Sequence, residues 1–297
     1  MSTAPTRDVS GRRSLDAVPA PLLVVVSIAS VQTGSAVART AFDELGAAGM
    51  VLLRLGLSSL LLLVLLRPGV RSWGRAQWRA VLLLGSAMAG MNLVFYLSIR
   101  TVPLGVAVTV EFLGPLLVAL VQTRRAVDFA WALLAAAGVV LLGLDGGGSA
   151  PLGGLVLAFV AGLFWGCYIL MSARVGSLLP GTGGLAVALA FAGCIALPFG
   201  ASGAVSALGD PRLLLVGLAV AVLSSIVPYS FELAALRRIP TRVFGVLMSL
   251  EPAAAAVAGL VVLGQALGTR ELAALTLVTL ASVGVTLGSR TPRPVEC

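Results

Sequence analysis

The chain has 297 residues and is 59% hydrophobic but only 11% charged, whereas a soluble domain carries about a quarter charged residues. Its net charge is +8, but all 20 basic residues are arginines spread over short connections, which excludes a nucleic-acid-binding stripe and indicates a membrane protein. The chain has no histidine, which removes the commonest metal ligand and the usual general base, so we expect no metal, no cofactor and no enzyme activity.

The first segment, residues 1–19, is predicted to be a cytoplasmic tail in front of an uncleaved first helix. The alternative is a secretory signal, because arginines precede the first apolar run and S-A-V-A at 35–38 resembles a cleavage site. Many further hydrophobic segments follow, which favours a membrane helix.

The hydrophobic segments have the length of membrane spans. A bilayer core of about 30 Å requires about 20 apolar residues in helical form. We predict ten spans, over residues 20–38, 47–66, 79–99, 104–122, 129–145, 152–173, 183–203, 213–234, 242–264 and 271–288. The connections are too short for a soluble domain, and residues 289–297 would form a second tail.

The arginines predict the orientation of these spans. Fifteen lie on the two tails and on the connections of one side, and four lie on the other side. Because positive residues accumulate on the cytoplasmic side, both termini are predicted to lie in the cytoplasm.

The chain also repeats itself. One constant shift along the sequence superposes Pro103 on Pro240 and Pro115 on Pro252. The two halves, 20–145 and 152–288, would each contain five spans, and an odd number makes their orientations opposite. Inverted repeats are typical of transporters, with the substrate site near the midplane. The alternative is the general likeness of all apolar helices.

Two carboxylic acids lie in the middle of predicted spans, each near a helix-breaking proline. Glu111 lies four residues before Pro115, and Glu251 directly precedes Pro252. An ionisable group at the bilayer centre costs at least ~2.5–3.5 kcal/mol, so each is a functional candidate. A buried carboxyl can hold either a proton or a substrate ammonium, which would compete. The alternative is a permanently neutral acid that is hydrogen-bonded to a neighbouring helix.

Two further charged residues lie within the spans. Arg54 could bind a substrate carboxylate or pair with Glu111, or it could extend to the outer membrane interface. Glu232 lies near the cytoplasmic arginines Arg237 and Arg238, which favours a structural ion pair. Polar and aromatic residues at similar depths would complete a pocket: Gln32, Asn92, Tyr96, Trp165 and Tyr229. Aromatic residues near helix ends are also typical of membrane interfaces.

Several long motifs resemble the drug/metabolite transporter superfamily with two EamA-type repeats. They are G-M-N-L-V-F-Y-L-S-I-R-T-V-P-L-G-V-A-V from Gly90, E-F-L-G-P-L-L-V-A-L from Glu111 and R-I-P-T-R-V-F-G-V-L-M-S-L-E-P-A from Arg238. The resemblance covers about 20–288 and departs mainly in the tails and around 146–151. It implies an all-α membrane protein of ten helices, with two inverted five-helix repeats around a central cavity.

The resemblance also implies efflux of small hydrophilic amino acids of the threonine or homoserine type. The family's arginine in the second helix matches Arg54, and its two acidic helix positions match Glu111 and Glu251. The expectation is a proton-driven amino acid exporter of the plasma membrane whose partners are its substrate, protons and lipid. The alternatives are a same-fold exporter of another metabolite or drug and a passive facilitator. The sequence does not indicate the oligomeric state.

Overall fold

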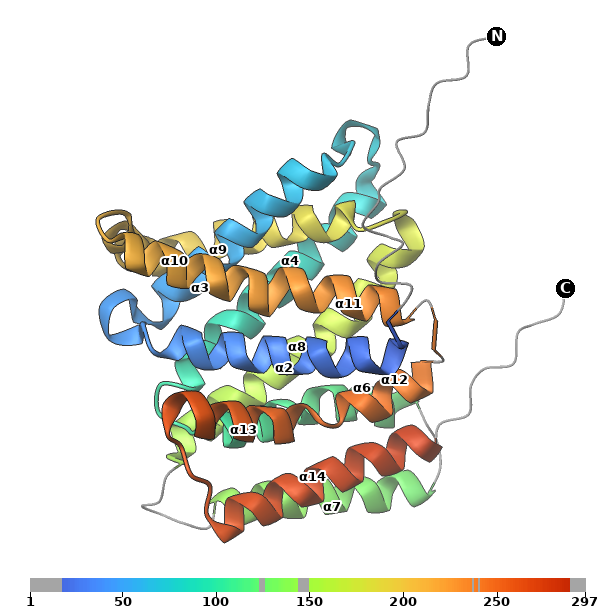
Figure 1. Cartoon of the computed structure of the whole chain (residues 1–297). Coiled ribbons are helices and arrows are strands. Elements are labelled where there is room, and N and C mark those ends of the chain that lie inside the picture. Colours follow the sequence, from blue (N-terminus) through green and yellow to red (C-terminus); the bar gives the residue numbers. More distant parts are fainter. Residues whose placement is uncertain (1–17, 123–125, 144–149, 237, 240, 289–297) are drawn as a thin grey trace, which may run out of the picture.

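The computed structural model describes residues 18–122, 126–143, 150–236, 238–239 and 241–288, and every regular element in these residues is a helix (Figure 1). Eight helices in this part of the chain are long and apolar enough to cross a membrane by length and composition. Two shorter apolar helices cover Leu104–Val118 and Phe129–Leu142. The fold is therefore an all-helical membrane protein, as expected, while the number of spans stays a prediction.

The first half of the chain forms a series of helices joined by short connections. They are α2 (Ala20–Arg39), α3 (Phe42–Leu66), η1 (Val70–Ser72), α4 (Arg75–Ser98), α5 (Leu104–Glu111), α6 (Leu113–Gln122) and α7 (Ala126–Gly143). The helix α4 begins at Arg75 rather than at residue 79, because hydropathy marks only the apolar part of a helix. The predicted tails lie mostly or wholly outside the described residues.

The second half continues with a similar series. It consists of α8 (Leu152–Leu178), α9 (Gly183–Leu208), α10 (Pro211–Ala221), the π-helical turn η2 (Val222–Ile226), α11 (Val227–Leu236), α12 (Thr241–Met248), α13 (Glu251–Leu263) and α14 (Thr269–Gly288). The helices α8 and α9 extend past their predicted ends at 173 and 203, for the same reason as α4.

Helix breaks lie where proline removes a backbone donor. The helix α5 ends at Glu111 and α12 ends at Met248, the residues whose carbonyl groups Pro115 and Pro252 cannot bond. The shift that superposes Pro103 on Pro240 also relates these two breaks. A further break was not predicted: the turn η2 precedes Pro228, which leaves the carbonyl of Ser224 without a helical donor.

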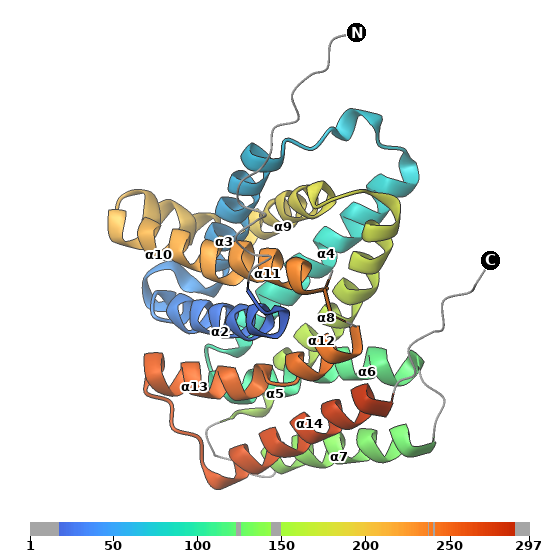
Figure 2. The same ribbon diagram turned by 45° about the vertical axis from the view of Figure 1, so that its right-hand side comes forward.

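Helices from the two halves alternate through the bundle. The helix α3 packs on α9, α4 on α8, α2 on α11 and α13, and α6 on α8. The pair α7 and α14 lies at one end of the bundle in both views (Figures 1 and 2). Side chains from helices of both halves form the site described below.

The helix α6 crosses α8 at a very short distance. A Cβ atom on Gly162 would meet the carbonyl oxygen of Glu111, and one on Gly114 would meet the backbone of Gly162. Only glycine permits this approach. The carbonyl that Pro115 leaves free is thus pressed against α8.

At one end of the bundle, side chains bind the backbone of neighbouring connections. Arg39 donates hydrogen bonds to the carbonyl oxygens of Val102 (3.0 Å) and Arg100 (3.3 Å). The side-chain oxygen of Gln265 accepts a hydrogen bond of 2.9 Å from the N–H of Leu104. These bonds connect α2 and the α13–α14 connection to the start of α5.

Candidate functional site

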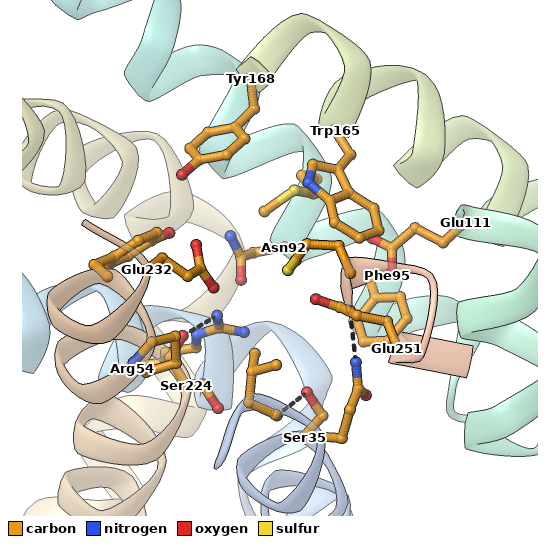
Figure 3. Close-up of a pocket in the computed structure, with 16 residues that line it drawn as sticks. Ser35, Arg54, Asn92, Phe95, Glu111, Trp165, Tyr168, Ser224, Glu232 and Glu251 are labelled. Atoms are coloured by element: carbon orange, nitrogen blue, oxygen red, sulfur yellow. Dashed lines mark hydrogen bonds between the residues drawn. The ribbon is translucent and has the colours of Figure 1, made fainter. Parts of the chain in front are cut away.

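A cavity of about 110 Å³ lies among helices of both halves (Figure 3). A water molecule needs about 10–15 Å³ by this measure, so the cavity has room for several waters or a small solute. Its walls come from α2, α3, α4, α5, α8, η2, α11, α12 and α13. The lining residues are Val31, Gln32, Ser35, Arg54, Met91, Asn92, Phe95, Glu111, Trp165, Tyr168, Ser224, Pro228, Tyr229, Glu232, Met248 and Glu251.

Three carboxylic acids and one guanidinium line this cavity. Glu111 is the last residue of α5 and Glu251 is the first residue of α13, so both acids lie beside a helix break. Their exposed fractions are only 7% and 6%. A negative charge at a helix N-terminus is favourable by about 0.3–1 kcal/mol, which helps to accommodate Glu251. The breaks therefore bring the two acids to the same cavity.

The three acids differ in their hydrogen bonds. The amide nitrogen of Gln32 donates to Glu251 Oε2 at 2.9 Å, and the hydroxyl of Ser27 donates to Glu232 Oε1 at 2.8 Å. For Glu111, no side-chain hydrogen bond occurs among the residues that the structure describes. Its carboxyl is the one most available to a bound molecule.

Arg54 lies in the cavity wall and does not extend to the membrane interface. Its exposed fraction is 5%, and its Nη1 and Nη2 atoms donate to the Tyr96 hydroxyl (3.3 Å) and the Ser224 carbonyl (2.8 Å). Pro228 leaves this carbonyl free, so the π-helical turn provides an acceptor for the guanidinium. No carboxylate of the described residues lies within ion-pairing distance of Arg54. The pair with Glu111, one of the expected alternatives, is not formed.

Some buried polar atoms on the cavity wall have no hydrogen-bond partner within the described part of the chain. They are Gln32 Oε1, Arg54 Nε and Ser224 Oγ. Leaving a buried donor or acceptor unsatisfied costs about 1–3 kcal/mol, so such atoms call for an explanation. These three atoms are enclosed by protein in this conformation, and Ser224 Oγ lies against Gly34 of α2, so they could meet a bound molecule only after their side chains turn.

Seven of the eight predicted side chains line the cavity, and Tyr96 does not. Tyr96 is fully buried behind Arg54, where its hydroxyl holds the guanidinium. Asn92 donates to the carbonyl oxygen of Met88 at 2.8 Å, and Trp165 packs against Phe112 with ring centres 5.6 Å apart. Tyr229 lies on α11, at the polar side of the cavity.

Glu232 lines the cavity as well, although it was not predicted to do so, and its carboxyl binds Ser27 (Figure 3). The ion pair expected with Arg237 or Arg238 stays a prediction. Arg237 lies outside the described residues. Pro228 was the available signal, because a proline four residues earlier on the same helix indicates an irregular, cavity-lining segment.

A cation site of protein ligands is not formed in this part of the structure. Among the described residues, no three cysteine, aspartate or glutamate side chains gather as ligands for a metal ion.

Comparison with known proteins agrees with this architecture. Residues 152–287 match the model of the EamA-like transporter family. The chain is 44% identical over 272 residues to the threonine/homoserine exporter RhtA of Escherichia coli (strain K12), covering 91% of this chain and 92% of the relative. The identity and coverage are the same for RhtA of Salmonella typhimurium (strain LT2).

A solved crystal structure has the same fold. Its TM-score is 0.59 at 19% identity, and the match covers 90% of this chain and 97% of the other. At this level of identity the likeness concerns the fold alone.

Proposed function

Since the chain belongs to the EamA-like transporter family, we propose that it exports small amino acids of the threonine or homoserine type in exchange for protons. The membrane would be the plasma (inner) membrane, as the RhtA relatives suggest. The relatives named threonine/homoserine exporter support the export of an amino acid, and the coupling to protons is inferred from the acids of the cavity.

The observation that carries the proposal is the set of charges around one small cavity. A zwitterion presents a carboxylate and an ammonium, and the wall offers Arg54 for the first and Glu111 for the second. The unpartnered atoms of Gln32 and Ser224 would serve a side-chain hydroxyl. A lipophilic drug would leave these donors and acceptors unsatisfied.

The proposed topology has ten spans in two inverted halves, with both termini in the cytoplasm. The helix bounds support the repeat: the shift that superposes Pro103 on Pro240 converts α5 (Leu104–Glu111) into α12 (Thr241–Met248). It also aligns α4 with the segment from α10 to α11, and α6 with α13. The distribution of arginines supports the orientation.

The cavity lining supports the same repeat. Most of the lining residues form pairs that this shift superposes. The pairs are Val31 with Tyr168, Met91 with Pro228, Asn92 with Tyr229, Phe95 with Glu232, and Glu111 with Met248. Inverted repeats that meet at a central site are typical of secondary transporters.

In the proposed cycle, a proton and the substrate ammonium compete for the same carboxyls. The substrate loads with its carboxylate on Arg54 and its ammonium on Glu111, next to Glu251. After release on the far side, protons occupy the acids and the empty carrier returns. The halves would move against each other at the α5–α6 and α12–α13 breaks, where helical hydrogen bonds are already missing.

Transport in sealed proteoliposomes tests the proposal. Vesicles with an acidic lumen are expected to accumulate labelled threonine, and collapse of the pH gradient should stop accumulation. Glu111→Gln and Glu251→Gln should each abolish accumulation, since glutamine cannot exchange a proton. The matched control is Glu44→Gln, an exposed acid that pairs with Arg212 at 3.4 Å away from the cavity.

The outcomes separate the alternatives. Accumulation that persists in both acid variants would refute the mechanism but not the family. If threonine and homoserine neither move nor compete, the substrate is another metabolite or a drug. Equal downhill flux in both directions, without any effect of pH, would identify a passive facilitator.

A further inference from the structure

Glu232 has a hydrogen-bond partner that suits both of its protonation states. The Ser27 hydroxyl oxygen lies 2.8 Å from Glu232 Oε1 and 3.5 Å from the carbonyl oxygen of Pro228. Ser27 is fully buried on α2, so water does not compete for its hydroxyl. The single hydroxyl proton can therefore point to either of two oxygen atoms.

These two arrangements correspond to two states of the acid. When Glu232 is ionised, Ser27 donates to the carboxylate. When Glu232 is protonated, its own O–H can donate to the Ser27 oxygen, and the Ser27 hydroxyl can turn to the Pro228 carbonyl. Neither state leaves the buried hydroxyl unsatisfied, and such a site loads and unloads a proton without a large rearrangement.

The other two acids of the cavity lack this arrangement. Glu251 accepts from the amide nitrogen of Gln32, and a protonated Glu251 would need the whole Gln32 amide to rotate before its oxygen could accept, whereas Ser27 needs only to turn a hydroxyl proton. Glu111 has no side-chain hydrogen bond within the described part of the chain. The geometry thus distinguishes an acid with a reversible hydroxyl partner from two acids that are better placed for a substrate.

The charge balance of the cavity leaves room for an additional proton. Arg54, Glu111, Glu232 and Glu251 face the cavity, together with the phenols of Tyr168 and Tyr229. If all three acids were ionised, the cavity would carry two uncompensated negative charges, which is costly at membrane depth. A zwitterion adds no net charge, so its binding does not remove this excess.

The repeat has an acid at this position in the second half only. The counterpart of Glu232 in the first half is Phe95, which also lines the cavity. In an inverted repeat these two positions lie at mirrored depths. The acid therefore occurs toward the end of α11 and has an apolar counterpart toward the opposite face of the membrane.

We propose that Glu232, with Ser27 as its positioning residue, is the proton-binding site from which the coupled proton leaves toward the cytoplasm. In this step the carboxyl O–H bond breaks, the proton passes to water, and the Ser27 hydroxyl turns from Pro228 to the new carboxylate. When a proton binds from the cavity, the carboxyl O–H bond forms again and the Ser27 hydroxyl turns back to the Pro228 carbonyl. The inference rests on the proposed function, because it assigns the proton of that exchange.

Two transport modes separate proton coupling from substrate movement. Exchange of labelled for unlabelled threonine without a pH gradient needs no net proton transfer, whereas accumulation against a concentration difference does. We expect Glu232→Gln to lose gradient-driven accumulation and its accompanying proton flux far more than it loses exchange. Full accumulation in Glu232→Gln would overturn the inference, and so would a parallel loss of both modes in folded protein.

The role of Ser27 has its own readout. Ser27→Ala removes the reversible partner but keeps the acid, so the pH profile of accumulation should shift, and Ser27→Thr should restore it. An unchanged profile in Ser27→Ala would refute the positioning role. Glu44→Gln, at an exposed ion pair, is the matched control for all three variants.

An infrared titration distinguishes failure of the inference from failure of the proposed function. The C=O band of a protonated carboxyl should titrate in the reconstituted protein without any substrate, and Glu232→Gln should remove part of it. If the wild type transports no amino acid but this band component is present, the substrate proposal fails and the proton site stands. If the component persists in Glu232→Gln, the proton site fails even where transport is normal.

Discussion

Arg54 is fixed by two neutral oxygen atoms and keeps one buried nitrogen free. The Tyr96 hydroxyl and the Ser224 carbonyl hold its Nη atoms, while Nε has no partner among the described residues. These partners orient the guanidinium without neutralising its charge. At the residue scale, a fixed guanidinium that forms no ion pair is suited to recognise a carboxylate.

Replacement of Arg54 should therefore weaken substrate binding more than folding. For Arg54→Gln we expect the half-saturating substrate concentration to rise by about 10- to 100-fold, since a charged hydrogen bond contributes roughly 1.5–3 kcal/mol. Arg54→Lys should recover little, because an ammonium cannot bind Tyr96, Ser224 and a carboxylate in one plane. Counterflow measurements test this, with the exposed Arg212→Gln as control. Unchanged affinity in Arg54→Gln would exclude the carboxylate role.

Tyr96 provides a weaker test of the same arrangement. Tyr96→Phe removes only the hydroxyl that holds Arg54 Nη1, which should cost about 0.5–1.5 kcal/mol and raise the half-saturating concentration roughly 2- to 10-fold. The ring remains to fill its buried position. If Tyr96→Phe weakened binding as strongly as Arg54→Gln, Tyr96 would contact the substrate itself.

At the scale of elements, the crossing of α6 and α8 fixes the position of Glu111. The carbonyl group that Pro115 frees lies against Gly162, and Gly114 contacts the same turn of α8. The end of α5 therefore cannot slide along α8 without losing this contact. The acid is held at the cavity by backbone packing and not by a side-chain partner.

Gly162→Ala should disrupt this crossing. Its added methyl group would meet the Glu111 carbonyl oxygen, and overpacking of this kind typically costs about 1–3 kcal/mol. Gly153→Ala on the same helix is the matched control, because its Cβ atom would meet nothing within 4 Å. Thermal unfolding in detergent should show a lower midpoint for Gly162→Ala alone. Equal midpoints would show that the helices separate easily.

The proline-linked breaks should affect transport rates. Pro115→Ala and Pro252→Ala restore a backbone donor that can bond the carbonyl groups of Glu111 and Met248, which favours helices that continue through the breaks. We expect equal or higher thermal stability but slower exchange. Pro198→Ala is the control, because Pro198 lies within the continuous helix α9 and does not line the cavity. Rates that equal the wild type would argue against movement at these breaks.

For the whole molecule, the proposed orientation makes Glu44 and Arg212 external and Ser72 cytoplasmic. In a background without native cysteines, Glu44→Cys and Arg212→Cys should react with an impermeant maleimide on intact cells. Ser72→Cys should react only after permeabilisation. The opposite labelling pattern would invert the topology and the direction of transport that follows from it.

Much of this architecture could be predicted from the sequence. Span positions follow from apolar length, and the breaks at Glu111 and Met248 follow from Pro115 and Pro252. The rotation of each helix could not be predicted, because a membrane helix that is apolar on all sides gives no amphipathic pattern. Depth alone therefore suggested Tyr96 as a lining residue and did not indicate that Glu232 faces the cavity. The turn at Pro228 depends on hydrogen-bond donors from α2 and α3, where Ser30 and Arg54 donate to the carbonyl oxygens of Leu223 and Ser224.

The bonds of Arg39 and Gln265 have a consequence for sequence drift. Their partners are the backbone carbonyls of Val102 and Arg100 and the backbone N–H of Leu104. Any residue type provides these groups, except that a proline at position 104 would lack the N–H. Side-chain substitutions in the α4–α5 connection would therefore preserve these hydrogen bonds. Substitutions that weaken these hydrogen bonds are expected at Arg39 and Gln265, while the exposed positions of the connection, Arg100 and Thr101, can diverge.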